Sequence, residues 1–386
     1  MTYFLDTDYC QEKKHTQRVA GDVFLSKRIE DERVITVLAD GLGSGVEANV
    51  LASLTATMGL EYVLGKIDTA RAAEIMMDAL PICRQRGISY STFTLVDTST
   101  DGQTRIIEHG NPAFLLIRDG RCIDIPTKII PRPRWKGRQL CCAQFSTQHG
   151  DRIIVYSDGV SQSGIGTPQY PFGWGVEKVK EFLETQIQLD PGISARQLSA
   201  ELVAQAVYND GRQAGDDMSC GVIHFRHPRH LRVLTGPPFD MERDRDFAHL
   251  LTGPESKAVC GGTTSNIVAR ELGKDLTMDL SEWDPDVPNI SHMEGIDLVT
   301  EGCLTLSKVA ELLESGEKPL RSNGATKLLQ LFLRHDIIEF VMGTRINEAH
   351  QNPSFPVELD IRRNLLKKII RLLESKHLKS TRLSYF

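Results

Sequence analysis

The distribution of apolar and polar residues predicts a β-hairpin near the N-terminus. Short runs rich in β-branched residues indicate strands at about 22–28 and 34–39, and the charged segment between them is typical of a turn. Paired in this way, the two strands would bring Asp22 near Asp40. After Asp40 the chain passes through a glycine-rich segment, which can bend tightly because glycine has no Cβ atom.

The same kind of pattern predicts a layered α+β fold for the first part of the chain. Further strands are indicated at 90–96, 104–108, 114–118, 122–125, 152–157 and 219–225, and helices at 45–65, 69–80, 176–188 and 194–208. The strands cluster and the helices come in pairs, so the order is not strictly alternating. This order favours an α+β layered fold over a doubly wound parallel sheet.

The second part of the chain has a different pattern. The segment 227–238 combines histidines and arginines with a Gly-Pro-Pro step, and it is interpreted as a domain junction. Beyond it, predicted strands and helices alternate, which indicates a smaller α/β domain over 240–386. The elements expected there are strands at 258–260, 296–300 and 337–342, a helix that follows Ser265 and ends at about Leu272, and helices at 306–313, 327–333 and 361–373.

Composition agrees with a chain of two domains. The sequence has 386 residues, which exceeds the usual size of one domain, and 40% of them are hydrophobic. The net charge of -6 argues against a nucleic-acid-binding surface. The eight cysteines form no metal-binding spacing and are interpreted as free thiols of a reducing compartment. With no membrane-spanning run or signal segment in the sequence, a cytoplasmic location is expected.

Four acidic residues beside glycines are the candidates for chemistry. Each lies next to a predicted apolar strand, in the pairs Gly21-Asp22, Asp40-Gly41, Asp158-Gly159 and Gly215-Asp216. Clustered carboxylates repel one another unless cations neutralise them, and all-oxygen ligands select Mg²⁺ or Mn²⁺ over zinc. Two such ions can lower the pKa of a bridging water and hold a phosphoryl group for in-line attack.

A surface turn, a dinucleotide-binding turn and a histidine site are the alternative interpretations of these segments. A single Asp-Gly step is usually a surface turn, and the segment 41–45 has a glycine pattern that is found in dinucleotide-binding turns. In this chain, however, Asp40 stands directly after the strand, where its charge would repel a pyrophosphate. His109 and His149 are more simply explained as hydrogen-bonded structural residues than as zinc ligands or general acids.

In combination, these motifs resemble a known enzyme family. The segments Gly21-Asp22, Ala39-Asp40-Gly41-Leu42-Gly43-Ser44-Gly45, Tyr156-Ser157-Asp158-Gly159-Val160 and Gly215-Asp216-Asp217-Met218-Ser219 occur in the order found in PPM metal-dependent serine/threonine protein phosphatases. The segment 108–113 is similar to the glycine-rich hairpin entry of the bacterial SpoIIE-like branch. The resemblance covers about residues 15–228, and the predicted phosphatase domain spans 1–228.

The resemblance implies a PPM-type α-β-β-α sandwich with two Mn²⁺ or Mg²⁺ ions at one edge. By position, Asp40 would bridge both ions, and Asp22 and the Gly41 carbonyl would complete the shell of one. Asp158 and Asp216 would complete the shell of the other. A hydroxide that bridges the ions would then attack the phosphoester directly.

Two neighbouring residues also receive roles from the resemblance. Asp217 would lie outside the direct ligands. Arg18 stands where some relatives keep a phosphate-binding arginine, and an exposed structural arginine is an equal alternative. The expected catalytic residues are therefore Asp40, Asp158 and Arg18.

The resemblance also implies partners and a mode of regulation. The expected substrate is phosphoserine or phosphothreonine on a bacterial regulatory protein, such as an anti-sigma-factor antagonist. A phosphatase-like sensor or scaffold, whose C-terminal domain binds a nucleotide, a phosphorylated metabolite or a partner protein, is the alternative. In the relatives, the helix after the Asp-Gly turn acts as a switch, so the helix at 45–65 is expected to control the metal site. No nucleic acid or membrane partner is expected, and a homodimer is left open.

The C-terminal domain carries a weaker motif. Gly261, Gly262, Thr263 and Thr264 lie at a predicted strand-to-helix turn, where backbone N–H groups and hydroxyls can bind an anion. Simple capping of the helix by Thr263 or Thr264 is the favoured explanation. The basic face of the last helix is interpreted as solvated surface, and a regulatory or partner-binding role is expected for 240–386.

Overall fold

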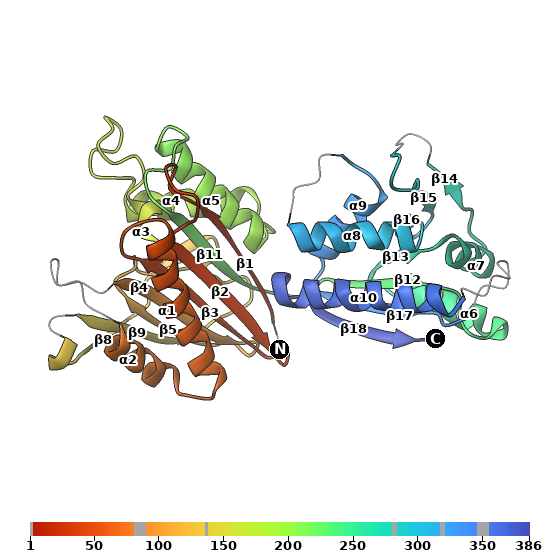
Figure 1. Cartoon of the computed structure of the whole chain (residues 1–386), viewed down its shortest axis with the longest axis horizontal. Coiled ribbons are helices and arrows are strands. Elements are labelled where there is room, and N and C mark those ends of the chain that lie inside the picture. The colour runs from red at the N-terminus through yellow and green to blue at the C-terminus, as the bar shows by residue number, and fades with distance from the viewer. Residues whose placement is uncertain (1–2, 81–89, 136–137, 280–283, 317–320, 346–354) are drawn as a thin grey trace. The chain divides into compact units, whose positions relative to one another are not determined.

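The chain divides into two compact units, which are described separately. The computed structural model describes residues 3–80, 90–135, 138–279, 284–316, 321–345 and 355–386. Unit 1 is Met1–His227 and unit 2 is Pro228–Phe386 (Figure 1). None of the helices in these described ranges has the length and apolar character that a membrane span requires.

Two antiparallel sheets form the centre of unit 1. Their strands are β1 (Phe4–Glu12), β2 (Asp22–Ile29), β3 (Arg33–Gly41), β4 (Ser91–Ser99), β5 (Gln103–His109), β6 (Leu115–Arg118), β7 (Arg121–Ile123), β8 (Lys128–Pro131), β9 (Gln139–Ser146), β10 (Arg152–Tyr156) and β11 (Met218–Arg226). One sheet has the order β2-β3-β4-β5-β9-β8 and the other the order β1-β11-β10-β6-β7. A buried apolar cluster that includes Leu38 of β3 and Ile223 of β11 fills the space between them.

Helices cover the outer faces of both sheets. They are α1 (Val46–Leu64), α2 (Thr69–Ala79), the short α3 (Asp158–Ser161), α4 (Val176–Leu189) and α5 (Ala195–Asn209), with a 3₁₀ turn η1 at Pro133–Trp135. Apolar residues of α1 and α2 pack on β3 and β4, and those of α4 and α5 pack on β10 and β11 (Figure 1). The predicted α-β-β-α layering is therefore confirmed.

Several strands of unit 1 were not predicted from the sequence. The first is β1, which pairs with β11 over its whole length, from Phe4 opposite Arg226 to Glu12 opposite Met218. Its second half is partly exposed and polar, so no simple alternation marks it. The strands β8 and β9 were also missed, because β9 pairs with β5, which is distant in sequence, and β8 pairs only with β9.

Unit 2 is built on a largely parallel sheet. Its strands are β12 (His230–Thr235), β13 (Ser256–Cys260), β14 (Thr277–Met278), β15 (Ser291–Met293), β16 (Ile296–Thr300), β17 (Ile337–Met342) and β18 (Ser380–Tyr385). Its helices are α6 (Asp244–His249), α7 (Gly262–Leu272), α8 (Cys303–Ser315), α9 (Gly324–Arg334) and α10 (Phe355–His377), with 3₁₀ turns η2 at Met241–Arg243 and η3 at Leu250–Thr252. Buried residues of α8, α9 and α10 pack on one face of the sheet, and those of α6 and α7 on the other.

The segment that was predicted to be a domain junction contains the central strand of unit 2. The strand β12 lies between β13 and β17 and is parallel to both. The predicted junction over 227–238 includes the division between the units, at His227 and Pro228, but its residues 230–235 belong to a strand of unit 2. Histidines and arginines flank a short apolar core in this segment, and only burial between two other strands explains why it is a strand.

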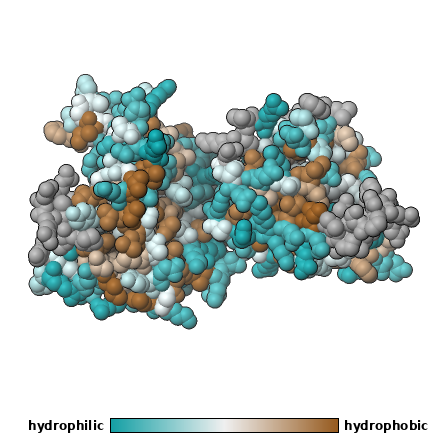
Figure 2. All heavy atoms as spheres, viewed as in Figure 1, coloured by the Kyte–Doolittle hydropathy of each residue, from teal (hydrophilic) through white to brown (hydrophobic). Residues whose placement is uncertain are grey.

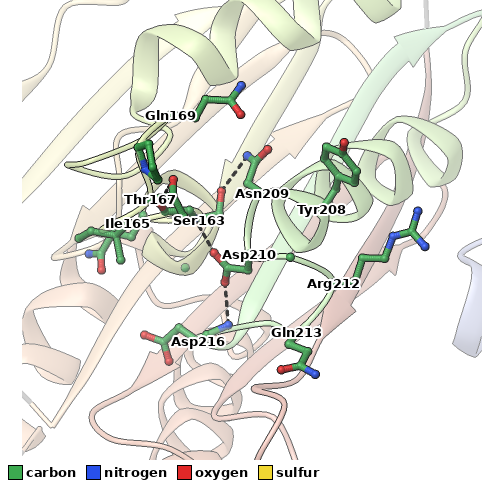
Figure 3. A pocket seen from close by; sticks show the side chains of 16 residues that line it. Ser163, Ile165, Thr167, Gln169, Tyr208, Asn209, Asp210, Arg212, Gln213 and Asp216 are labelled. Atoms are coloured by element: carbon green, nitrogen blue, oxygen red, sulfur yellow. Dashed lines mark hydrogen bonds between the residues drawn. The ribbon is translucent and has the colours of Figure 1, made fainter.

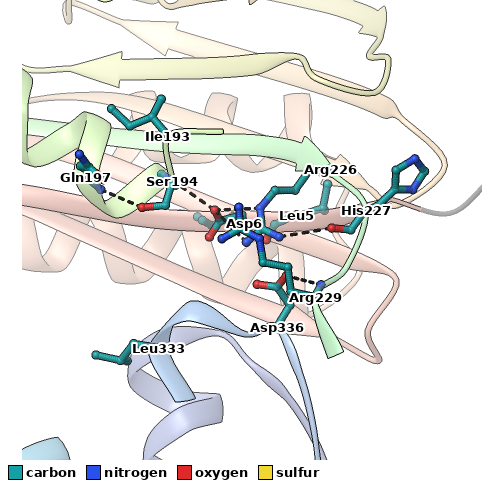
Figure 4. Close-up of polar contacts among 12 residues, drawn as sticks. Leu5, Asp6, Ile193, Ser194, Gln197, Arg226, His227, Arg229, Leu333 and Asp336 are labelled. Carbon is teal, nitrogen blue, oxygen red and sulfur yellow. Dashed lines mark hydrogen bonds and ion pairs between the residues drawn. The ribbon is translucent and has the colours of Figure 1, made fainter. Parts of the chain in front are cut away.

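Buried carboxylates anchor the chain ends of each unit. In unit 1, Asp6 of β1 forms an ion pair with Arg226 of β11 at 3.2 Å and accepts a hydrogen bond from the backbone of Ala195 at 3.3 Å (Figure 4). In unit 2, the fully buried Asp336 accepts a hydrogen bond from the backbone N–H of Arg229 at 2.7 Å (Figure 4). These bonds fix the start of β1 and of β12 in their own sheets.

The contact between the two sheets of unit 1 predicts the effect of a single methyl group. A Cβ atom at Gly221 of β11 would lie 2.1 Å from the ring of Phe24, which stacks on Tyr9 with ring centroids 4.6 Å apart. We expect Gly221→Ala to lower the free energy of unfolding by about 1–3 kcal/mol, because the ring has no free space to move into. Urea unfolding measures the change.

The matched control is Gly192→Ala in unit 1. A Cβ atom there approaches only the exposed side chain of Asp190, at 3.3 Å, so this variant should unfold like the native protein. Equal stability of the Gly221→Ala protein and the control would contradict the described packing between the sheets.

Candidate functional site

The hairpin of β2 and β3 brings two acidic residues together, as predicted. Asp22 and Asp40 are direct cross-strand partners. Asp22 is only 2% exposed, and both of its carboxylate oxygens are buried. Burial, together with the charges of Asp217 and Asp158, raises the pKa of Asp22 to about 7, although hydrogen bonds from the Ser157 and Ser219 side chains act in the opposite direction.

Asp40 lies at the centre of this acidic cluster. Burial raises the pKa of Asp40 to about 9, with further contributions from the charges of Asp22, Asp158 and Asp216. Asp22, Asp158 and Asp216 therefore all lie close enough to Asp40 to raise its pKa. Without a cation, this arrangement retains protons that ordinary carboxyl groups have lost at neutral pH.

The other two acids are held by the ends of β10 and β11. Asp158 begins α3, directly after β10, and Asp216 precedes β11. Ser157 donates its backbone N–H to Ser219 at 3.0 Å and accepts from the Ser219 N–H at 2.9 Å through its hydroxyl. A Cβ atom at Gly159 would lie 2.2 Å from the Asp217 carbonyl oxygen, so the two segments meet without room for a side chain. Burial also raises the pKa of Asp216.

The residues present fit divalent cations with oxygen ligands. Within the described ranges, no three or more acidic, histidine or cysteine side chains converge on one ion position. One ion would therefore take a further ligand from the Gly41 carbonyl, and both ions would take ligands from water, as Mg²⁺ commonly does. The observation that supports the fit is the burial of the Asp22 carboxylate beside other carboxylates, because this arrangement is costly in the absence of a cation.

The turn after Asp40 packs tightly against the first helix. A Cβ atom at Gly41 would lie 2.0 Å from the carbonyl oxygen of Ala48, so Gly41 packs directly on the backbone of α1. Asn49 of α1 donates to the Ala20 carbonyl at 2.8 Å, next to the start of β2. A displacement of α1 would therefore move the segments that carry Asp22 and Asp40.

Lys14 and Asn111 lie near the cluster, and the sequence had assigned no role to either residue. The Lys14 ammonium lies 4.0 Å from Asp216, and the backbone N–H of Lys14 donates to Asp217 at 2.9 Å. Asn111 donates to the Leu38 carbonyl at 3.4 Å and so supports β3 two residues before Asp40. Both contacts join segments far apart in the sequence, and no local pattern marks them.

Asp217 and Arg18 differ in how far the structure describes their roles. Asp217 is 5% exposed, and its carboxylate binds the backbone at Lys14. Arg18 is exposed on the segment beside Gln17, which donates to the Ser44 hydroxyl at 3.3 Å. This contact places the Arg18 segment beside the glycine-rich turn, and a role in phosphate binding stays a prediction.

A cavity of about 860 Å³ adjoins the acidic cluster. Gly159 and Asp216 belong to its lining, which otherwise comes from the segments 162–169 and 208–215 (Figure 3). Asp210 connects these segments, because its carboxylate accepts hydrogen bonds from the backbone N–H of Gly164 and, at 2.7 Å, of Gly215. The cavity is therefore a formed feature beside the candidate metal ligands.

The histidines that were weighed as alternative ligands have structural partners. The buried His109 shares a hydrogen bond with the Gln139 carbonyl at 3.0 Å, and burial lowers its pKa. The ring of His149 packs on that of His227, with centroids 4.2 Å apart. Both observations agree with the structural interpretation.

The predicted anion motif of unit 2 lies at the end of β13. Gly261 is the N-cap residue of α7, and Gly262, Thr263 and Thr264 form its first turn. Among the described residues no side chain caps this helix, so the preferred prediction that Thr263 or Thr264 caps it was wrong.

Comparison with known proteins identifies relatives of unit 1. The family model of stage II sporulation protein E (SpoIIE) matches residues 30–226. This match includes Asp40, Asp158 and Asp216 but begins after Asp22. No curated protein is similar in sequence to the chain.

Solved structures with a similar arrangement include bacterial phosphatase domains. The PP2C phosphatase domain, with a fragment of the regulatory domain, of SpoIIE from Bacillus subtilis is 19% identical, with a TM-score of 0.49. The similarity covers 58% of this chain and 64% of that chain, which is less than two thirds of the relative. The RsbU and RsbW domains of a Mycobacterium tuberculosis protein are 19% identical over 71% of each chain, with a TM-score of 0.47. RsbX in complex with magnesium is 19% identical over 57% of this chain and 95% of that chain, with a TM-score of 0.41.

The raised pKa values predict how stability depends on pH and metal. In the folded, metal-free protein the pKa of Asp22 is about 7 and that of Asp40 about 9, against an ordinary value of 3.8 for both. The folded state therefore binds more protons than the unfolded state across this range, and stability falls as pH rises from about 4 to about 9. Mn²⁺ binds the ionised form, so we expect its stabilising effect to grow with pH over the same range.

Thermal unfolding with EDTA or with Mn²⁺, at several pH values, measures this effect. The Asp22→Asn variant should show a weaker pH dependence without metal, because one of the two carboxyl groups is gone. A stabilisation by Mn²⁺ that is equal at acidic and alkaline pH, or absent at both, would count against the candidate site.

Proposed function

Because the chain belongs to the stage II sporulation protein E (SpoIIE) family, we propose that unit 1 is a metal-dependent phosphatase that acts on phosphoserine or phosphothreonine of a regulatory protein. The observation that supports this most directly is the group of Asp22, Asp40, Asp158 and Asp216 at the edge of the sandwich, in which Asp22 is buried and the other three are half-buried. Such a group is unstable without cations and suits phosphoryl chemistry with them.

The proposed ligands divide into two sets that share Asp40. Asp22 and the Gly41 carbonyl would hold one Mn²⁺ or Mg²⁺ ion, and Asp158 and Asp216 the other. When bound, the two ions would supply an activated water and neutralise charge on the phosphoryl group. Gln162 donates to Asp158 at 2.8 Å and thereby orients that carboxylate.

Two cations of the chain are suited to bind the phosphate of the substrate. Lys14 lies beside Asp216, with 34% of its side chain exposed, and Arg18 is exposed on the same segment. The adjoining cavity of about 860 Å³ offers space for the residues that flank the phosphorylated side chain. A regulatory protein such as an anti-sigma-factor antagonist is the proposed substrate class, by resemblance to the family.

The alternative is a phosphatase-like sensor or scaffold with little turnover. The complete set of four acids favours the enzyme, since a scaffold has no need for carboxylates that repel one another. A role of unit 2 in regulation or partner binding agrees with both alternatives.

We also propose that α1 is the regulatory element of unit 1. Its outer face exposes Val46, Val50 and Leu54, which are 54% to 66% exposed, and its inner face contacts Gly41 through Ala48. Figure 2 shows apolar side chains at the surface of unit 1 where this helix lies. A regulator that binds the exposed stripe would move the helix and, through Gly41, the metal ligands.

Substitution of the proposed ligands tests the enzyme directly. We expect Asp40→Asn and Asp158→Asn to lower kcat/KM by about 100-fold or more, because loss of metal assistance removes several kcal/mol of transition-state stabilisation. Hydrolysis of p-nitrophenyl phosphate and of a phosphoserine peptide with Mn²⁺ measures the change. Asp190→Asn, an exposed carboxylate at the end of α4, is the matched control.

The outcomes of this experiment are distinct. Metal-dependent turnover that is lost in both variants but kept in the control supports the proposal. Full activity of Asp158→Asn would refute the assignment of that ligand, and no turnover by the native protein on either substrate would favour the scaffold.

The contact between Gly41 and α1 predicts a second effect on activity. In Gly41→Ala the added methyl group would lie 2.0 Å from the Ala48 carbonyl, so either the turn or the helix must move. We expect a higher Mn²⁺ concentration for half-maximal activity, with a fall in kcat of about tenfold or more. Gly192→Ala again serves as the control, and an unchanged Mn²⁺ requirement would mean that α1 does not control the site.

A further inference from the structure

The sheet of unit 2 has the strand order of a doubly wound fold. The parallel strands lie in the order β16-β13-β12-β17-β18. From β12 the chain first adds β13 and β16 on one side and then β17 and β18 on the other, so the order reverses between β12 and β17. In open α/β sheets, ligands bind outside the carboxyl ends of the strands at this reversal.

Glycines occupy the carboxyl ends of the four strands next to the reversal. They are Gly236 after β12, Gly261 after β13, Gly302 after β16 and Gly343 after β17. A Cβ atom at Gly343 would lie 2.1 Å from the Pro237 carbonyl oxygen, and one at Gly302 would lie 3.4 Å from Cα of Gly261. The ends of these strands therefore approach one another closely.

Two helices begin at this edge without a side-chain cap. Gly261 is the N-cap of α7 and Gly302 that of α8, and in the described ranges neither first turn receives a capping hydrogen bond from a side chain. Because Gly261 and Gly302 are in contact, the two N-termini lie side by side. The N–H groups at a helix N-terminus and the helix dipole favour an anion.

An arginine of α10 reaches the same edge. The Arg362 guanidinium comes within 2.9 Å of a Cβ position at Gly236 and within 4.0 Å of one at Gly302. Its Nε is buried and, among the described residues, has no hydrogen-bond partner. Burial raises the pKa of the Cys260 thiol. The charge of Glu301 raises this pKa further and the charge of Arg362 lowers it, so both charged groups lie near the end of β13.

Three further polar groups at this edge are buried without partners in the described part of the chain. Thr305, in the first turn of α8, is 0% exposed, and its hydroxyl is unpaired. Arg345 follows β17 and binds Asp244 through one nitrogen at 3.5 Å, while its other terminal nitrogen is unpaired. One carboxylate oxygen of Glu301 is likewise unpaired. Buried polar groups without partners are rare and indicate an absent ligand or water.

These groups together specify the chemistry of a ligand. The arginines and the two helix N-termini suit a phosphate, and Asp244 neutralises only part of their charge because it is also paired with Arg270 at 2.6 Å. The Glu301 carboxylate would repel a bare anion but accepts hydrogen bonds from hydroxyl groups. An alternative is that the glycine at 236 serves only to admit the Arg362 side chain, but this leaves Thr305 and Glu301 unexplained.

We propose that the carboxyl edge of the unit 2 sheet binds a small phosphorylated metabolite that carries hydroxyl groups. Arg362 and the first turns of α7 and α8 bind the phosphate, Thr305 adds a hydrogen bond, and Glu301 accepts from a hydroxyl of the ligand. The site is independent of the phosphatase proposal, since it uses no residue of unit 1.

Binding to the full chain tests the proposal without any activity assay. Inorganic phosphate, ribose phosphate and AMP are the probes, and ribose and adenosine are controls without phosphate. Thermal unfolding and isothermal titration calorimetry measure binding. We expect the phosphate esters to bind at least about tenfold more tightly than inorganic phosphate, because only they engage Glu301.

Three variants make the outcome decisive. Arg362→Gln should weaken binding by about tenfold or more, and Arg363→Gln, an exposed neighbour on the same helix, should bind like the native protein. Thr305→Val should weaken binding while leaving the ligand-free protein as stable as before or more so, since the lost hydroxyl had no partner among the described residues.

Each result bears on the proposal. Binding of a phosphate ester that is lost in Arg362→Gln and kept in Arg363→Gln supports it. It is overturned if none of the phosphate compounds binds at millimolar concentration, if ribose and adenosine bind equally well, or if binding survives in Arg362→Gln. A marked loss of ligand-free stability in Thr305→Val would also overturn the role given to that hydroxyl.

Discussion

The repulsion between buried carboxylates at one edge of the sandwich is the constraint on which unit 1 depends. The direct pairing of Asp22 with Asp40 is fixed by the register of β2 and β3, so the two charges cannot separate without loss of the hairpin. The ends of β10 and β11 add Asp158 and Asp216 to the same region. Folding supplies the energy that holds this group together, and cations are the partners that relieve it.

This constraint explains why glycines surround the site. Gly41 permits backbone contact with Ala48 of α1, and Gly159 permits contact with the carbonyl of Asp217. Larger residues would push apart the segments that carry the acids. The same close contacts connect the acids to α1. A site in which carboxylates repel one another is therefore in contact with a helix whose outer face is apolar and exposed.

Much of this site was predictable from the sequence because its signals are local. An acid beside a glycine at the end of an apolar run marked Asp22, Asp40, Asp158 and Asp216. Lys14 and Asn111 were missed, since each contacts the site across a long stretch of chain. In unit 2, the sequence indicated the turn at 261–264, but β12 was missed, and Arg362 was assigned to a solvated face. Their positions depend on tertiary packing, which no short pattern encodes.

The two units place glycine-rich backbone and charge to different ends. Unit 1 uses glycines to bring acids together, whereas unit 2 uses them to expose helix N-termini beside Arg362.

The central claim is that the acids of unit 1 retain protons until cations displace them. Calorimetric titration with Mn²⁺ near pH 8 in buffers of different ionisation enthalpy tests this most directly. The account predicts saturable binding with net proton release that is lost in Asp40→Asn, because the pKa of Asp40 without metal is about 9. Absence of binding, or binding without proton release, would contradict it.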